Sequence, residues 1–269
     1  MEEKGVAIIT GSSSGIGFET SILLARNGFI TYATMRNLDK SSRLSEIVNK
    51  ENLDMKILRL DVTDDNSVRE SIDKIISETK RIDILVNNAG FAIFGAMEET
   101  SLDEMKEQFE TNFFGSVRTI QAVLPTMKKQ KKGKIINVSS MVGRFGVPFN
   151  SLYVSSKFAL EGLSESLRYE LHNYGIDVIL VEPGIIKSEF FKNIKISNKS
   201  GSHSSYSNLL QNRLKGIESM LKTKSSSPST VARSILNIIN SNISDIRYAV
   251  GEDAVFMTNL KKNLTDEEF

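Results

Sequence analysis

Residues 6–17 read Val-Ala-Ile-Ile-Thr-Gly-Ser-Ser-Ser-Gly-Ile-Gly, and this stretch decides the fold class. The run Val6–Thr10 is apolar and β-branched and predicts a buried strand. The apolar residues of Ile16–Asn27 then follow the period of a helix that ends at Gly28. Glycines between a strand and a helix let the backbone turn tightly and approach a pyrophosphate, and the helix N-terminus adds N–H donors and positive potential.

This loop predicts a dinucleotide-binding site, and the alternative is a tight turn that only caps the helix. A glycine triplet alone is a weak signal, but this one directly follows a predicted strand and opens a helix. The residues expected to contact the cofactor here are Gly11, Ser13, Ser14, Gly15, Ile16 and Gly17.

The rest of the chain alternates between short β-branched runs and amphipathic stretches. Strands are predicted at Val6–Thr10, Ile30–Met35, Lys56–Leu60, Ile84–Val86, Lys134–Val138, Val178–Val181 and Arg247–Val250. Helices are predicted at Ile16–Asn27, Asn66–Thr79, Leu102–Met127, Leu152–Tyr174 and Thr230–Ile239. Strands separated by long helices form βαβ units with a parallel sheet. We predict an α/β fold with a doubly wound parallel sheet (a Rossmann fold), three αβα layers and a single domain over residues 1–269.

Composition excludes several classes of protein. The 269 residues carry 34 basic and 33 acidic side chains, and this net charge of +1 argues against a nucleic-acid partner. The absence of cysteine excludes disulfides and thiolate chemistry, and two histidines are too few for a histidine-rich metal site, so no metal is predicted. No apolar run is long enough to cross a membrane, and the acidic start does not resemble a secretion signal. We expect a cytoplasmic location.

The end of the second predicted strand bears on the choice of cofactor. A site for NAD has an acidic residue about 20 positions beyond the glycines, where it binds the ribose 2′-hydroxyl. Here the strand ends Ala33-Thr34-Met35-Arg36-Asn37, with no carboxylate, and Arg36 lies nineteen residues after Gly17. A guanidinium suits a 2′-phosphate. We therefore favour NADP (NADPH) over NAD, and the alternative is that Arg36 is a surface residue without a ligand.

Tyr153 and Lys157 stand one helical turn apart, so both project from one face of the helix predicted there. Ser140 lies thirteen residues upstream. A phenol, an ammonium group and a hydroxyl can together move a proton on or off an alcohol or ketone. The pair alone carries little weight, because a plain amphipathic helix also gives this spacing.

Together these motifs resemble the short-chain dehydrogenase/reductase superfamily. The residues that carry the resemblance are Thr10–Gly17, Asn87-Asn88-Ala89-Gly90, Ser140, Tyr153-x-x-x-Lys157 and Pro183-Gly184, which extend over Val6 to Ser188. Within the superfamily, the stretches 32–36 and 147–162 are most similar to the 17β-hydroxysteroid dehydrogenase and retinol dehydrogenase branch.

The resemblance implies a role for each of four catalytic residues. Tyr153 would be the general acid in carbonyl reduction and the base in alcohol oxidation, and Lys157 would lower its pKa and hold the nicotinamide ribose. Ser140 would bind the substrate oxygen, with Ser139 as the adjacent alternative. Asn112 would hold a water relay to the lysine, or else only bend or cap its helix.

The resemblance also completes the cofactor site. Asp61, followed by Val62, would accept from the adenine amino group, and a helix N-cap is the alternative for this aspartate. Asn87 would tie neighbouring strands together. The other cofactor residues are Tyr153, Lys157, Asn88, Ala89 and Gly90, then Pro183, Gly184, the Ile186 backbone and Ser188.

The segment Ile185–Pro228 has no clear period and is predicted to be a mobile substrate lid, with a disordered surface insertion as the alternative. The expected pocket wall is apolar and comprises Phe91, Ile93, Phe94, Met141, Phe145, Val147, Phe149, Phe190 and Phe191. A small hydrophobic alcohol, ketone or aldehyde is the expected substrate. A charged substrate is not expected, because no arginine pair flanks the catalytic segment.

The leading hypothesis is an oxidoreductase that transfers hydride between NADP(H) and such a substrate. One alternative is a non-catalytic NADP-binding sensor or scaffold, although proteins of that kind usually lack one of the four catalytic residues. Another is a nucleotide-sugar epimerase or dehydratase, which the glycine spacing opposes. By resemblance, Leu102–Met127 and Leu152–Tyr174 would form the interfaces of a homodimer or homotetramer.

Overall fold

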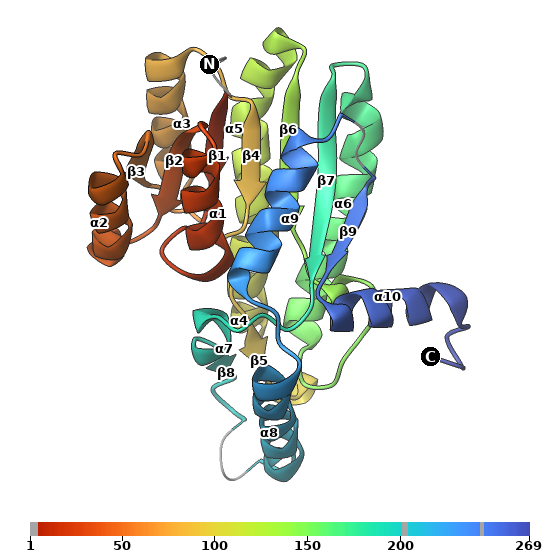
Figure 1. Cartoon of the computed structure of the whole chain (residues 1–269). Helices are drawn as coiled ribbons and strands as arrows, with labels where there is room; N and C mark the ends of the chain where they lie inside the picture. The colour runs from red at the N-terminus through yellow and green to blue at the C-terminus, as the bar shows by residue number, and fades with distance from the viewer. Residues whose placement is uncertain (1–4, 201–203, 243–244) are drawn as a thin grey trace.

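The chain forms a parallel seven-stranded sheet with helices on both faces (Figure 1). The computed structural model describes residues 5–200, 204–242 and 245–269. The strand order is β3-β2-β1-β4-β6-β7-β9, and every pairing in this sheet is parallel. Its strands are β1 (Val6–Ile9), β2 (Ile30–Met35), β3 (Met55–Arg59), β4 (Ile84–Asn87), β6 (Gly133–Val138), β7 (Ile176–Pro183) and β9 (Arg247–Val250).

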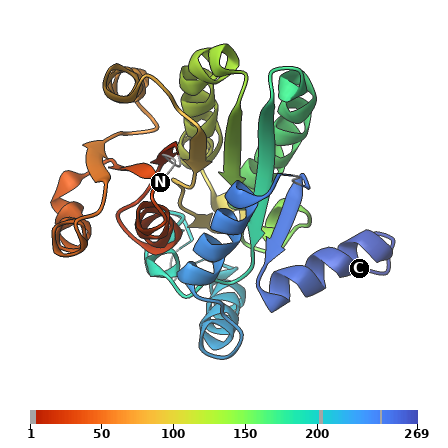
Figure 2. The ribbon, with the colours of Figure 1, turned by 45° about the horizontal axis from the view of Figure 1, so that its top comes forward.

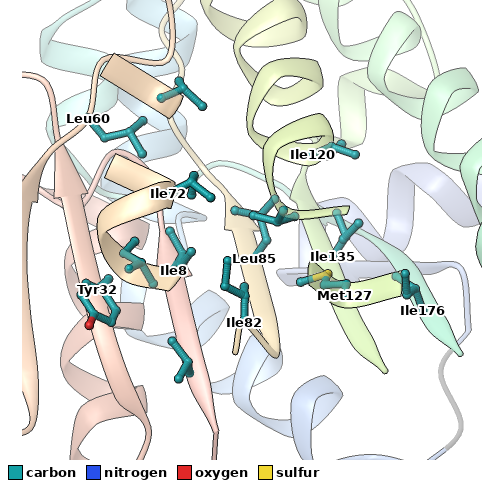
Figure 3. Close-up of a cluster of buried hydrophobic side chains, with 14 of the residues drawn as sticks. Ile8, Tyr32, Leu60, Ile72, Ile82, Leu85, Ile120, Met127, Ile135 and Ile176 are labelled. Atoms are coloured by element: carbon teal, nitrogen blue, oxygen red, sulfur yellow. The ribbon is translucent and has the colours of Figure 1, made fainter. Parts of the chain in front are cut away.

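Two layers of helices cover the sheet (Figure 2). One face packs against α1 (Gly15–Arg26), α2 (Ser42–Glu51) and α9 (Pro228–Asn240). The other face packs against α3 (Asp65–Thr79), α5 (Gly115–Gln130) and α6 (Ser151–His172). Figure 3 shows the core of this second face, where side chains from α3 and α5 interdigitate with those of the central strands. Burial on both faces explains why the strands are continuous apolar runs.

The predicted α/β fold is therefore confirmed, and all seven predicted strands are found. The helices that were not predicted include α2 and α10 (Glu252–Asn263), and α10 extends away from the sheet in Figures 1 and 2. Short 3-10 helices lie at Leu38–Ser41, Met97–Glu99 and Met141–Gly143. In the described part of the chain, none of the helices combines the length and hydropathy that a membrane span requires.

The helix predicted over Leu102–Met127 is found, but it contains a π-helical turn in its middle. Helix α4 (Leu102–Phe109) passes into a π-helical turn at Glu110–Phe114, and α5 begins only at Gly115. A π-turn widens the helix and is often found at functional sites. Asn112 lies inside this turn, so the irregularity coincides with a residue predicted to be catalytic.

Helices also occur in the segment that showed no clear period. It contains α7 (Glu189–Lys192), β8 (Lys195–Ile196) and α8 (Ser207–Thr223). Strand β8 pairs in parallel with β5 (Ile93–Phe94), so the segment is attached to the region that follows β4. In Figure 1 these elements lie beyond the carboxyl ends of the parallel strands, the edge where ligands bind in such sheets.

Candidate active site

The glycine loop follows β1 and opens α1, as the sequence predicts. Gly11 and Gly15 have positive φ angles of +69° and +59°, which side-chain-bearing residues adopt only with strain. A Cβ atom on Gly17 would lie 2.5 Å from both the Gly11 carbonyl oxygen and Asn88 Nδ2. Ser14 precedes α1 without forming a side-chain cap, so its hydroxyl is not used by the helix. This loop keeps its backbone bare beside a helix N-terminus, which suits a pyrophosphate group.

Asn88 fixes the shape of this loop. Its Nδ2 donates to the carbonyl oxygens of Thr10 (2.9 Å) and Gly11 (3.1 Å). In return, Thr10 Oγ1 accepts from the backbone N–H groups of Asn88 and Ala89, both at 3.0 Å. The preceding Asn87 donates to Asn137 Oδ1 at 2.9 Å and thereby joins β4 to β6, as expected.

Arg36 and Asp61 lie just beyond the ends of β2 and β3. Arg36 is exposed and forms no hydrogen bond or ion pair with the described residues, so its guanidinium is available to a ligand. Asp61 Oδ1 accepts from the backbone and hydroxyl of Thr63. The alternative of Asp61 as a helix N-cap is wrong, because Asp64 caps α3. Val62 is buried against α5 at Gly115, where a Cβ atom would lie 2.7 Å from Val62 Cγ2.

Ser140, Tyr153 and Lys157 come together at the end of β6. Ser140 lies two residues beyond this strand, and its hydroxyl is close enough to the Tyr153 phenol on α6 to lower the pKa of that phenol. Lys157 is only 5% exposed. Its Nζ donates to the Val138 carbonyl oxygen at 2.8 Å and lies 5.5 Å from the centre of the Tyr153 ring. The thirteen-residue spacing thus selects Ser140, since the neighbouring Ser139 hydroxyl lies beside Gly143.

Burial decides the protonation of this group. Burial raises the pKa of Tyr153 to about 12, and the hydrogen bond to Ser140 opposes that shift. Burial also lowers the pKa of Lys157 to about 8, against the charge of Glu161. The expected lowering of the Tyr153 pKa by Lys157 is therefore not observed. At pH 7 the phenol is protonated and the lysine is mostly an ammonium ion.

Asn112 holds the chain that follows β4. Its Oδ1 accepts from the Phe91 N–H at 3.1 Å, and its Nδ2 donates to the Phe91 carbonyl oxygen at 3.0 Å and to Ser156 Oγ at 3.2 Å. Ser156 is the neighbour of Lys157, so Asn112 joins the π-turn to the helix of Tyr153. Gln108, a buried residue that the sequence analysis missed, binds Phe91 and Ile93 in the same way. In the sequence, its position one helical turn before Asn112 could have indicated that Gln108 lies beside that residue.

The loop after β7 brings Pro183, Gly184, Ile186 and Ser188 to the same edge. The backbone of Ser226 forms two hydrogen bonds, one to Ile185 and one to Lys187. As in any parallel bridge, the N–H and C=O of the residue between them, Ile186, therefore point away from Ser226. Ser188 lies beside the glycine loop, since a Cβ atom on Gly15 would be 3.4 Å from its Cβ. All four residues thus lie at the edge of the sheet that carries the glycine loop.

The apolar wall is only partly as predicted. Phe94, Phe149, Phe190 and Phe191 belong to a cluster that includes Tyr153 and the α8 residues Leu210, Leu214 and Ile217. The Phe190 ring lies 5.6 Å from that of Tyr153. An open cavity of about 490 Å³ lies beside Phe149 and Ser151. In contrast, Phe145 packs against Phe269, 5.2 Å away. A larger hollow of about 850 Å³ beside α10 contains none of the predicted site residues.

Glu161 is a second buried residue that the sequence analysis missed. It lies one turn after Lys157 on α6 and is 5% exposed, and its Oε2 pairs with Arg247 Nε at 2.8 Å. The same Arg247 nitrogen lies 3.3 Å from Glu182, which is 2% exposed. Burial and the Glu182 charge raise the pKa of Glu161 to about 7. In the sequence, only its position one helical turn after Lys157 could have indicated that Glu161 lies at the site.

Fold and site together define an oxidoreductase with a Rossmann fold. Residues 5–199 match the short chain dehydrogenase family. The chain is 43% identical over 213 residues to a 3-ketodihydrosphingosine reductase of Bacteroides thetaiotaomicron, covering 79% of this chain and 76% of the relative. It is also 43% identical over 187 residues to bovine retinol dehydrogenase 8, covering 68% of this chain and 59% of the relative. The protein belongs to the short-chain dehydrogenase/reductase family, whose members act on CH–OH and C=O groups.

Solved structures agree with this assignment. The ElxO structure with NADP bound has a TM-score of 0.77 at 28% identity and covers 94% of this chain and 99% of its own. A short-chain dehydrogenase/reductase of Burkholderia phymatum in complex with NAD has a TM-score of 0.84 at 20% identity, covering 97% of this chain and 94% of its own. Both NADP and NAD therefore occur with this fold.

Proposed function

We propose that the protein is an NADPH-dependent reductase of hydrophobic ketones or aldehydes, with Tyr153 as the general acid. The observation that carries the proposal is that Ser140, Tyr153 and the buried Lys157 come together at the end of β6, with the Lys157 ammonium 5.5 Å from the centre of the Tyr153 ring. The non-catalytic sensor is the weaker alternative, because the serine, tyrosine, lysine and asparagine are all present.

The protonation state of Tyr153 is the one that reduction of a carbonyl requires. A phenol with a pKa of about 12 is protonated at pH 7, so Tyr153 can donate a proton to a carbonyl oxygen. Ser140 would hold that oxygen by a hydrogen bond. Lys157 would stabilise the phenolate that forms, because an ammonium group favours a nearby anion. Asn112 would keep the backbone of Phe91 in place beside these groups.

The residues around the glycine loop fit NADPH. The bare backbone of Gly11, Gly15 and Gly17 would hold its pyrophosphate, and the unpaired Arg36 would bind its 2′-phosphate. The remaining contacts would come from Ser13, Ser14, Ile16, Asp61, Val62, Asn88, Ala89, Gly90, Lys157, Pro183, Gly184, Ile186 and Ser188. When bound, the nicotinamide supplies the hydride, and Tyr153 would supply the proton.

The segment 185–228 would act as a mobile lid over the substrate. Phe190 packs against Tyr153, and Phe191 and Leu214 belong to the same cluster, so a substrate would reach Tyr153 only if these side chains moved. The names of the two relatives, a 3-ketodihydrosphingosine reductase and a retinol dehydrogenase, agree with an apolar compound as substrate.

Assembly and location belong to the same proposal. We expect a homodimer or homotetramer built on α4, the π-turn, α5 and α6, whose exposed aromatic residues include Phe114, Phe158 and Tyr169. We expect it to act in the cytoplasm. Light scattering in solution tests the first expectation, and imaging of a fluorescent fusion tests the second.

Loss of the Tyr153 hydroxyl tests the central claim. Tyr153→Phe should lower the turnover of the best ketone by about 10²–10⁴-fold, the usual contribution of a general acid, and should leave NADPH affinity nearly unchanged. NADPH absorbance measures turnover against a panel of steroids, retinoids, long-chain ketones and aromatic aldehydes. Tyr169→Phe is the matched control, because this tyrosine lies on the same helix and is 82% exposed. Equal turnover in both variants would remove Tyr153 from the mechanism.

A further inference from the structure

Within the described residues, Arg213 on α8 is a half-buried cation without a partner. Its Nε–H is inaccessible and donates to no acceptor, and its guanidinium forms no ion pair there. Burial lowers its pKa, with no neighbouring carboxylate to oppose the shift. Partial burial of an unpaired charge is unfavourable, so such a group is a candidate for pairing with a ligand.

The helix places Arg213 at the border of the apolar wall. Leu210, Leu214 and Ile217 of α8 pack in the cluster that includes Tyr153 and Phe190. At about 100° per residue, Arg213 lies about 60° around the helix from Leu210 and neighbours Leu214 and Ile217. A substrate that reached Tyr153 by displacing the apolar side chains of this cluster would extend towards α8, on which Arg213 stands beside them.

The net charge of the segment 185–228 also favours an anionic ligand. Residues 185–228 contain eight basic and two acidic side chains, a net charge of +6, whereas the complete chain has only +1. The basic residues are Lys187, Lys192, Lys195, Lys199, Arg213, Lys215, Lys222 and Lys224. Lys192 and Lys195 pair with glutamates, but most of the others have no ion pair among the described residues. A concentration of one sign at the mouth of a site attracts ligands of the opposite sign.

We propose that Arg213 binds an anionic oxygen group, a carboxylate or a phosphate, at the far end of an apolar substrate whose carbonyl group lies at Tyr153. A guanidinium presents its N–H groups as a fork that matches such anions. The inference rests on the proposed function and narrows its substrate class to amphiphilic anions. It also replaces the expectation that the substrate carries no charge. That expectation was based only on the absence of an arginine pair beside the catalytic segment.

Calorimetry of the protein saturated with NADPH tests this without turnover. Decanoate, decyl phosphate and decan-1-ol share one chain length and differ in the head group. The unmodified protein should bind at least one anion about 10–100-fold more tightly than the alcohol, the range for a hydrogen bond to a charged group. Arg213→Met should lose this preference and bind decan-1-ol as before, and Arg213→Lys should keep part of it. Which anion binds more tightly identifies the head group.

Arg233→Met is the matched control, because Arg233 is an exposed arginine on α9 and its removal changes the net charge equally. It should keep the full preference. Failure to bind either anion, equal affinity for anions and alcohol, or a preference that Arg213→Met retains would each overturn the inference. Turnover of 2-decanone by Arg213→Met reports separately on the proposed function. If both proteins reduce 2-decanone equally and neither prefers anions, the reductase stands and the anion site falls.

Discussion

Replacement of Glu161 by glutamine should shift the pH dependence of catalysis through Lys157. Residues four apart on a helix have Cβ atoms about 6 Å apart. Two unit charges at that distance interact by about 3 kcal/mol at an effective dielectric constant of about 20, or about two pKa units. This is an upper limit, because Arg247 shares the carboxylate and because Glu161, with a pKa of about 7, is only partly ionised at neutral pH. We expect a shift of about one to two units.

The sign follows from the charges. The Glu161 carboxylate favours the ammonium form of Lys157 and opposes the burial that lowers its pKa to about 8. Without this carboxylate the lysine loses its proton at a lower pH. If the ammonium form is the active one, kcat/KM falls as the pH rises through the Lys157 pKa. In Glu161→Gln this fall should begin about one to two pH units earlier.

The assay is kcat/KM for ketone reduction at saturating NADPH between about pH 5.5 and pH 9.5, and the quantity of interest is the difference between variant and parent. Glu165→Gln is the control, because Glu165 pairs with the same Arg247 at 2.6 Å but is 51% exposed and lies two turns from Lys157. A merely structural role would lower the rate of Glu161→Gln at every pH. Superimposable profiles of Glu161→Gln and the parent would refute the coupling.

Three further outcomes are expected. Arg36→Ala should raise the Michaelis constant for NADPH by about 10–100-fold, the range for a charged hydrogen bond, and should change the constant for NADH little. Equal changes in the two constants would mean that Arg36 does not bind the 2′-phosphate. Gly17→Ala should lower the free energy of unfolding by about 1–3 kcal/mol and abolish NADPH binding. Gly162→Ala, which has open space at its Cβ, should do neither. Urea denaturation measures the stability, and fluorescence titration measures the binding of NADPH. NADPH with substrate should slow proteolysis within 185–228, and unchanged cleavage would argue against a lid.

The sheet and the glycine loop were predictable because the physics that forms them is local. A strand buried on both faces must be apolar throughout. Gly11 and Gly15 have φ angles that other residues do not adopt without strain, and Gly17 leaves no room for a Cβ atom. The catalytic helix was equally visible, because one turn separates Tyr153 from Lys157. In each case neighbouring residues in the sequence carry the whole signal.

The missed features depend on contacts between distant segments. Helix α8 has apolar residues at Leu210, Leu214, Ile217 and Leu221, which is a helical spacing, but Asn, Lys and Gly residues between them obscured it. The π-turn breaks a helical period that continues on both sides, and its side-chain bonds reach to Phe91. Glu161 reads as an ordinary surface glutamate until β7 and β9 cover it.

Burial also links the proton donor to the lid. The desolvation that raises the Tyr153 pKa to about 12 comes in part from Phe190 and the other apolar side chains packed around its ring. A state in which these side chains move away would admit water and bring that pKa closer to its ordinary value of about 10. Closure of the proposed lid would therefore raise the pKa of Tyr153. Burial lowers the pKa of Lys157 and the charge of Glu161 opposes that shift, so the two buried groups next to each other on α6 depend on opposite effects of their surroundings.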